Sequence, residues 1–165
     1  ASRLPLRANV VRNLFFQINE LMEDRLMQLA IEEAMKAPYP YAAVLVKEGK
    51  VIVTAGTTSE DSLDPTAHAE ISVIRKACSE LKTNNLHGLE MYTTVEPCPM
   101  CFSASWWAKI SKIYFGISLA ESSKLLFPEM DVTSHYLNEH SGRKIELVGG
   151  ILSEQIRELF NNLKK

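Results

Sequence analysis

The sequence has few cysteines, no excess of positive charge and no long apolar segment, and each absence excludes a class of protein. Three cysteines, an odd number, make a poor disulfide framework and favour a reducing compartment in which thiolates are free for other chemistry. A formal net charge of −2 provides no general attraction for nucleic acids. No apolar run approaches the ~20 residues of a membrane helix, and the first residues lack a secretory signal pattern. We therefore expect a cytoplasmic protein that does not enter membranes.

A chain of 165 residues, 46 % of them hydrophobic, fits one globular domain with a full core. Residues 1–20 have mixed charge and no clear pattern, so we treat them as an N-terminal extension and residues 21–165 as the domain. The apolar positions after residue 20 recur at roughly helical spacing and predict a helix that ends at the prolines of "APYP" (37–40). These positions are Leu21, Leu26, Leu29, Ala30 and Met35.

Strands and helices alternate in the rest of the chain. Residues 41–56 have the pattern of a β-hairpin whose two β-branched runs meet at Glu48-Gly49-Lys50. Further strands are expected at 88–95, 112–117 and 144–151. Helices are expected at 67–81, 98–110, 120–127, 130–140 and 153–165. This alternation predicts an α/β sandwich with a mixed sheet.

Two of the predicted helices begin with metal-ligating side chains. His68 follows Pro65 at the start of one helix, and Cys98 and Cys101 lie three residues apart at the start of another, in "TVEPCPMC". Residues at i and i+3 face the same point on a helix, so one imidazole and two thiolates can converge. Three protein ligands with a fourth position left for water form the catalytic zinc pattern. Cys78 lies about 15 Å further along the first helix and is expected to be a small core residue.

A carboxylate accompanies these ligands. Glu70, two residues after His68, can reach a water at the metal without being a ligand, and can move that water's proton to a substrate. His-x-Glu together with Pro-Cys-x-x-Cys is the pattern of zinc deaminases. A thiol redox pair at Cys98 and Cys101 is the alternative, but it leaves the His68-Ala69-Glu70 segment unexplained. A purely structural zinc site lacks a fourth ligand.

On these motifs the sequence resembles the cytidine deaminase-like superfamily, in particular its branch of bacterial guanine deaminases and tRNA adenosine deaminases. The segments "DPTAHAEI" (64–71) and "EPCPMC" (96–101) are close to the motifs of that branch. The resemblance implies a three-layer α/β/α sandwich around a five-stranded mixed sheet and a homodimer. It also implies a zinc ion held by His68, Cys98 and Cys101, with Glu70 as the proton shuttle.

The substrate is less clearly indicated by the resemblance. The helix segment "CFSASWWAKI" (101–110) is similar to that of guanine deaminases, so a free nucleobase, guanine first, is the leading candidate. Trp107 is expected to stack on the base, the Ala69 backbone N–H to contact a substrate carbonyl, and Glu121 to fall near an acidic position of guanine deaminases. Thr57 stands where the branch usually has asparagine, which alters base recognition because a hydroxyl offers fewer hydrogen bonds than an amide.

The C-terminal part favours a different substrate. The segments "MDV" and "GGILSEQIRELF" resemble the tRNA enzymes, so a tRNA-specific adenosine deaminase is the first alternative and tRNA a partner to consider. Deamination of cytosine or another amino-heterocycle is the second alternative.

Overall fold

A five-stranded mixed sheet forms the centre of the computed structural model, which describes residues 4–163 and side chains from residue 9 onward. The helices are α1 (Leu4–Ala34), α2 (Ala69–Leu81), α3 (Pro99–Trp107), α4 (Leu119–Leu125), α5 (Ser134–Glu139) and α6 (Ser153–Asn162). The strands are β1 (Ala42–Lys47), β2 (Lys50–Gly56), β3 (Leu89–Val95), β4 (Lys112–Ile117) and β5 (Glu146–Gly149).

The strand order in the sheet is β2-β1-β3-β4-β5. β1 pairs antiparallel with both β2 and β3, whereas β3–β4 and β4–β5 are parallel. The first pair is the hairpin expected from the sequence, and the parallel pairs are the consequence of the intervening helices, which return the chain to the same end of the sheet.

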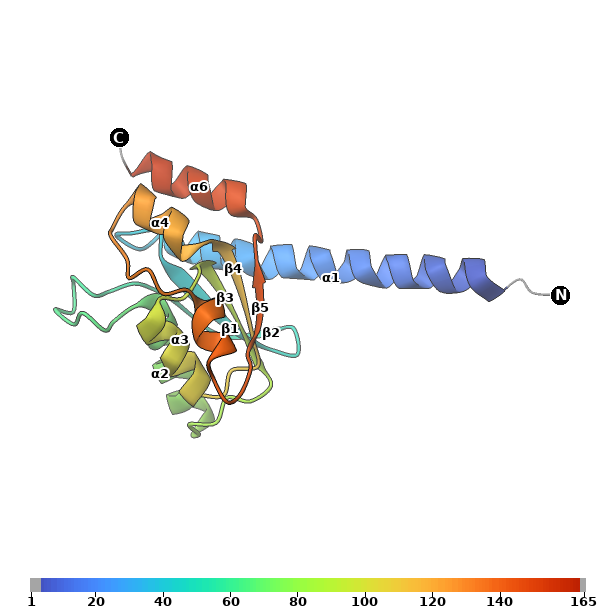
Figure 1. The fold of residues 1–165 in the computed structure, drawn as a ribbon, viewed down its shortest axis with the longest axis horizontal. Helices are drawn as coiled ribbons and strands as arrows, with labels where there is room; N and C mark the ends of the chain where they lie inside the picture. Colours follow the sequence, from blue (N-terminus) through green and yellow to red (C-terminus); the bar gives the residue numbers. More distant parts are fainter. Residues whose placement is uncertain (1–3, 164–165) are drawn as a thin grey trace.

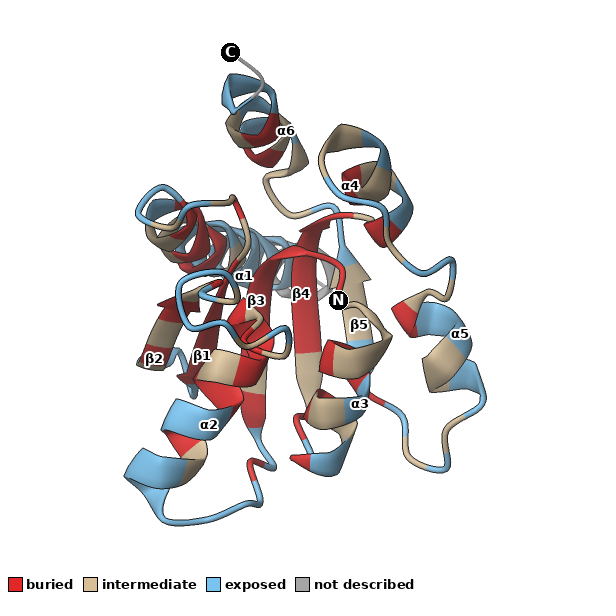
Figure 2. Ribbon diagram, turned by 90° about the vertical axis from the view of Figure 1, so that its left-hand side faces the viewer, coloured by how far each residue is buried: buried red, intermediate tan, exposed pale blue. Residues whose placement is uncertain are grey.

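Helices cover both faces of the sheet. Successive side chains of the central strands point to opposite faces, so each strand contributes to both cores. In β1, Ala43 and Leu45 belong to a core beneath α2 and α3, while Val44 and Val46 belong to a second core beneath α1 and α6. Figure 2 shows the buried residues concentrated in the central strands. The predicted three-layer α/β/α sandwich with a five-stranded mixed sheet is therefore confirmed (Figure 1).

Helix α1 differs from its prediction in length and in its buried face. It begins at Leu4 rather than near residue 20, because the chain contains no glycine there and its single proline, Pro5, lies in the first turn where proline is tolerated. The predicted apolar positions Leu21 and Met35 are each 70 % exposed.

The side of α1 that packs on the sheet is formed by a different apolar set. Its buried residues are Leu26, Met27, Ala30, Ile31 and Ala34. The division of the chain at residue 20 stays a prediction, since α1 crosses it without a break. Among the described residues, no helix combines the length and apolar character needed to cross a membrane.

Candidate active site and metal centre

The first residues of α2 and α3 lie side by side on one face of the sheet, at the end where β3 leads into α3 (Figure 1). His68 is the N-cap residue of α2 and Cys98 is the N-cap residue of α3, and both have extended backbone conformations. Pro99 follows in the first turn of α3, where its missing N–H costs nothing. The side chains of both caps therefore project from the helix starts toward one point.

His68, Cys98 and Cys101 converge with the geometry of a zinc site. Their ligand atoms all lie within 4.8 Å of one another, and His68 Nδ1 is 3.7 Å from Cys98 Sγ and 3.6 Å from Cys101 Sγ. Tetrahedral zinc with Zn–S near 2.3 Å and Zn–N near 2.0 Å would place its ligands about 3.5–3.8 Å apart. The three side chains thus fit zinc in distance and in chemical type.

The electrostatics of the cluster favour thiolate at Cys98. The hydrogen bond from the Cys101 thiol, assisted by the bond to His68, lowers the pKa of Cys98 to about 4. The same bond to Cys98, together with burial, raises the pKa of Cys101. Because thiolate is the form of cysteine that binds metal, one ligand of the three is already in the binding state and the second loses its proton when metal binds.

Glu70 lies next to this cluster without joining it. Its side chain is buried, with 7 % exposure, and its carboxylate accepts a hydrogen bond of 3.1 Å from the Thr93 hydroxyl of β3. Burial, followed by the nearby Cys98 thiolate, raises the pKa of Glu70. A carboxyl group whose pKa is raised above its usual range is a stronger base and is suited to accept a proton from water.

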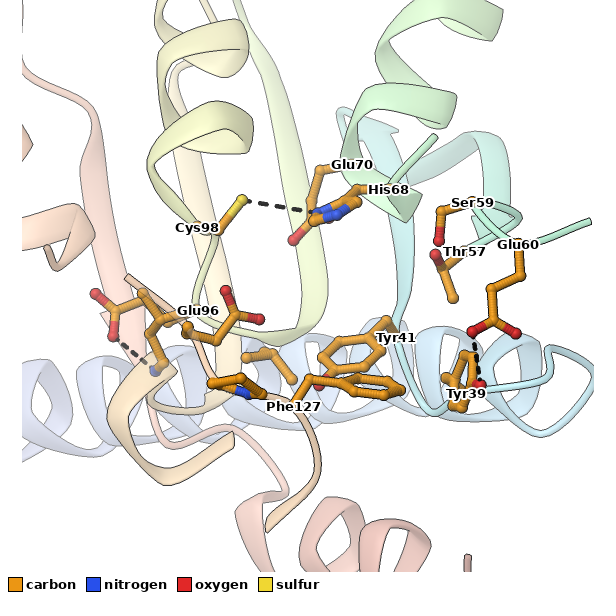
Figure 3. Close-up of a pocket in the computed structure, with 14 residues that line it drawn as sticks. Tyr39, Tyr41, Thr57, Ser59, Glu60, His68, Glu70, Glu96, Cys98 and Phe127 are labelled. Carbon is orange, nitrogen blue, oxygen red and sulfur yellow. Dashed lines mark hydrogen bonds between the residues drawn. The ribbon is translucent and has the colours of Figure 1, made fainter. Parts of the chain in front are cut away.

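A cavity of about 320 Å³ opens in front of the metal cluster. His68, Glu70 and Cys98 form its inner wall, while Tyr39, Tyr41 and Phe127 lie across from them (Figure 3). The wall thus combines a reactive cluster with flat aromatic surfaces.

The aromatic wall is a packed unit. The ring of Phe127 meets Tyr39 edge-on at 4.8 Å and stacks on Tyr41 at 6.4 Å between centroids. Burial raises the pKa of Tyr41 to about 12, so its hydroxyl stays protonated and forms a bond of 3.1 Å with Ser122 Oγ. The volume and the rings of this cavity suit a planar heterocycle.

The comparison with protein families agrees with this geometry. Residues 22–117, more than half of the chain, match the family model described as the cytidine and deoxycytidylate deaminase zinc-binding region. The chain belongs to this family. It is a zinc-dependent deaminase of a nucleobase or nucleoside, which confirms the superfamily, the zinc ion and the reaction type expected from the motifs.

The relatives of the deaminase include both tRNA-specific adenosine deaminases and a guanine deaminase. The chain is 40 % identical over 145 residues to the tRNA-specific adenosine deaminase of Aquifex aeolicus, which covers 83 % of this chain and 95 % of that protein. It is 38 % identical over 90 residues to the guanine deaminase of Bacillus subtilis, which covers 54 % of this chain and 58 % of that protein. A structure from a study of A-to-I editing by tRNA:A34 deaminases superimposes with a TM-score of 0.70 at 31 % identity, covering 82 % of this chain and 98 % of that one.

Only some of the residues expected to bind substrate lie at the cavity of the deaminase. Thr57 lines the cavity, where its hydroxyl lies 3.5 Å from the Ala67 carbonyl oxygen. Ala69 is buried in the first turn of α2, beside His68 and Glu70, although its atoms are not part of the cavity wall.

Two other expected residues lie away from the cavity. Trp107 is 74 % exposed and meets the Trp106 ring edge-on, with 5.1 Å between centroids. Glu121 accepts a 2.5 Å ion-pair hydrogen bond from Arg157 of α6. Since neither lines the cavity, their roles toward the substrate stay predictions.

Most of the cavity wall was not anticipated from the sequence. Tyr39 and Tyr41 precede β1 in "PYPY", and Phe127 and Glu129 belong to the loop after α4. For Tyr39 and Tyr41, the only available signal was the alternation of tyrosine and proline just before β1. The loop residues carry no motif, and they are brought to the cavity by the packing of α4.

Glu96 lines the cavity and holds the outer elements of the deaminase in place. Its buried carboxylate accepts the backbone N–H of Leu119 at 3.0 Å and of Ser134 at 2.8 Å. The Ser134 hydroxyl in turn donates to the carbonyl oxygen of Pro97 at 2.8 Å. The starts of α4 and α5 are thus tied to the segment that carries the cysteine ligands.

Proposed function

We propose that this deaminase converts adenosine to inosine within a tRNA. The observation that carries the proposal is the extent of its similarity to the two branch types. The alignment with a tRNA-specific adenosine deaminase runs through 95 % of that protein, whereas the alignment with a guanine deaminase stops at 58 %. The C-terminal segments that resemble the tRNA enzymes support the same substrate.

The chain's own residues divide the work of the reaction. His68, Cys98 and Cys101 would hold the zinc ion, which, when bound, supplies a Lewis acid that lowers the pKa of a water. In the overall reaction, the water oxygen forms a bond to C6 of adenine, the bond from C6 to the exocyclic nitrogen breaks, and ammonia leaves. All remaining steps are proton transfers.

Glu70 is assigned those transfers. Its carboxylate takes a proton from the water, delivers it to the ring nitrogen beside C6, and then helps to protonate the departing amine. Its burial excludes bulk solvent as a competing acid or base, and the Thr93 hydroxyl fixes the carboxylate toward the cavity. The raised pKa of Glu70 supports this role because a more basic carboxylate accepts the proton of the water more readily.

The aromatic wall supports a nucleotide within a single-stranded loop as the substrate. Phe127 is 38 % exposed at the rim, so a base that has left its stack can exchange stacking on its neighbours for stacking on these rings.

The decisive experiment incubates the purified protein separately with tRNA and with free guanine, adenine and cytosine. Inosine in the tRNA, detected by nuclease digestion and mass spectrometry, is the expected product, and the Glu70→Gln variant serves as the inactive control. The Michaelis constant for tRNA should rise steeply with salt, because phosphate contacts release counterions. Ammonia release from guanine without inosine formation in tRNA would replace this proposal by guanine deamination.

A further inference from the structure

The loop between α4 and α5 lies along the rim of the cavity in front of the metal cluster, here called the reaction cavity. Three consecutive residues of this loop, Phe127, Pro128 and Glu129, line the reaction cavity (Figure 3). We call residues 127–132 the flap. Each of its residues is exposed or only partly covered, and the flap runs along the outside of the molecule (Figure 2). Because a segment that buries little surface is held weakly, the position of the flap depends on a few specific contacts.

The helices on both sides of the flap are anchored. The carboxylate of Glu96 accepts the backbone N–H groups of Leu119 and Ser134, the first residues of α4 and α5. In the middle of α4, the Ser122 hydroxyl forms a hydrogen bond of 3.1 Å with the Tyr41 hydroxyl. Since these contacts hold α4 and α5 in place, movement is confined to the loop that joins them.

Between these anchors the flap makes few contacts. The ring of Phe127 meets Tyr39 edge-on at 4.8 Å and stacks on Tyr41 at 6.4 Å between centroids. Within the described part of the chain, a single hydrogen bond joins the flap to α4, from the Glu129 backbone N–H to Ser123 Oγ at 3.1 Å. Phe127 is therefore the main contact between the flap and the opposite wall of the reaction cavity.

A second cavity, of about 210 Å³, lies between the flap and α4. Residues 129–133 form one side of it, and the other side is formed by Leu119, Ala120, Ser123 and Lys124. Glu129 borders both this second cavity and the reaction cavity. Protein interiors normally contain few voids larger than a water molecule. The flap thus has space on both sides and can move toward α4 without displacing packed side chains.

We propose that the flap is a gate, which opens toward α4 to admit the substrate and closes to exclude water during the reaction. In the closed position Phe127 contacts Tyr39 and completes the aromatic wall of the reaction cavity. Opening separates the two rings, widens the rim and moves the flap into the second cavity. Closure restores a dry environment for the proton transfers of Glu70. The gate acts on entry to the reaction cavity, so it applies whichever base the enzyme deaminates.

The first test measures the movement directly, by fluorine NMR of the full chain labelled with para-fluorophenylalanine. The chain has six phenylalanines, and Phe102 and Phe160, which are buried at 2 % and 0 % exposure, serve as internal controls. The Phe127 signal, assigned with a Phe127→Leu variant, should show exchange on the microsecond-to-millisecond timescale of loop closure. The signals of the two controls should not. Absence of exchange at Phe127, or equal exchange at all three rings, would overturn the proposal.

The second test shifts the gate in both directions with two variants. Ala120→Leu, at an exposed position of α4, fills the second cavity and should block opening. Phe127→Ala removes the contact with Tyr39 and should favour opening. The matched controls are Ser79→Leu on the exposed side of α2 and Tyr136→Ala on α5, since neither position lines either cavity.

The probe of this second test is ortho-phenanthroline, a planar and uncharged zinc chelator that must enter the reaction cavity to remove the metal. Loss of an edge-to-face aromatic pair changes the ratio of closed to open flap by about two- to ten-fold, so Phe127→Ala should speed zinc removal by about that factor. Ala120→Leu should slow zinc removal by a similar factor, because access scales with the open fraction.

Both outcomes of the chelator experiment are informative. Unchanged zinc removal in Ala120→Leu, or equal rates for a gate variant and its control, would overturn the proposal. Ala120→Leu should also suppress the exchange of the Phe127 signal, which provides a second measurement if Phe127→Ala fails to fold. Neither measurement requires turnover, so failure of the gate and failure of tRNA deamination give different results.

Discussion

Thr93 Oγ1 lies 3.1 Å from Oε1 of Glu70 and donates a hydrogen bond to it inside the protein. Both residues are buried, at 2 % and 7 % exposure, so this hydrogen bond is shielded from bulk solvent. A strand residue thereby sets the direction of a helix residue that faces the cavity. This relationship gives Thr93 a positioning role that can be separated from zinc binding.

Replacing Thr93 with valine should lower kcat by about ten-fold and leave the zinc content unchanged. The methyl group fills the same space, but the carboxylate loses a bond worth on the order of 1.5–3 kcal/mol and becomes free to rotate. Thr93→Ser keeps the hydroxyl and should retain most of the activity. Metal analysis and steady-state kinetics of both variants check this expectation. Equal kinetics of the two variants would show that the hydroxyl plays no part.

Glu70→Gln should remove at least ~10³-fold of kcat, since general acid–base catalysis contributes 10²–10⁴-fold and the amide cannot carry a proton between atoms. The zinc content should stay at one per chain because Glu70 is not in the ligand set. Substantial turnover by this variant would transfer the proton shuttle to another group.

Cysteine substitutions should distinguish a zinc ligand from a cysteine that does not bind zinc. Cys98→Ala removes one of three ligands, and we expect loss of both zinc and activity in elemental analysis and tRNA assays. Cys78, a free and half-buried cysteine of α2, is the matched control. Cys78→Ala should keep its zinc and its activity. The wild-type protein should also keep both after exchange into a buffer without chelator. Zinc retained by Cys98→Ala would contradict the assigned ligand set.

Glu96→Ala should destabilise the fold by about 2–5 kcal/mol. It leaves the buried backbone N–H groups of Leu119 and Ser134 without their acceptor, and each unsatisfied group costs about 1–3 kcal/mol. Glu158→Ala, on the exposed side of α6, should change stability by less than about 0.5 kcal/mol. Urea unfolding of the two variants measures the difference, and similar midpoints would mean that Glu96 does not clamp α4 and α5.

A methyl group at Gly116 should cost about 1–3 kcal/mol through overpacking. A Cβ there would clash with the Ile156 side chain and lie 2.8 Å from the backbone carbonyl oxygen of Thr94, which cannot rotate away. At Gly142 nothing lies within 4 Å of such a Cβ, so Gly142→Ala is the control and should be close to neutral. Thermal unfolding compares the two, and equal midpoints would contradict the close packing of α6 on β4.

The metal cluster could be predicted from the sequence because each of its ligands belongs to a short motif. His68, Cys98 and Cys101 each stand at a helix start marked by proline, and the strand–helix alternation brings such starts to one end of a sheet. The strands were predictable for a similar reason: a short continuous apolar run such as that of β1, rich in β-branched residues and bounded by turn residues, is typical of a buried strand.

The cavity wall was not predictable because its residues are joined only by tertiary packing. Phe127 and Glu129 come from a loop that carries no motif, whereas Glu121, which has the expected charge, is engaged by Arg157. The length of α1 was missed for a different reason. Periodicity detects a helix by its buried face, and residues 9–22 of α1 are all exposed in the described fold.

The unbroken course of α1 has a consequence for the position of its exposed half. Between Pro5 and Ala34 the helix contains no proline or glycine, so it has no built-in hinge. From Asn9 to Leu26, the first of its described side chains that is buried, it spans about 26 Å. A group attached at the outer end of α1 would therefore be held at a fixed distance from the sheet.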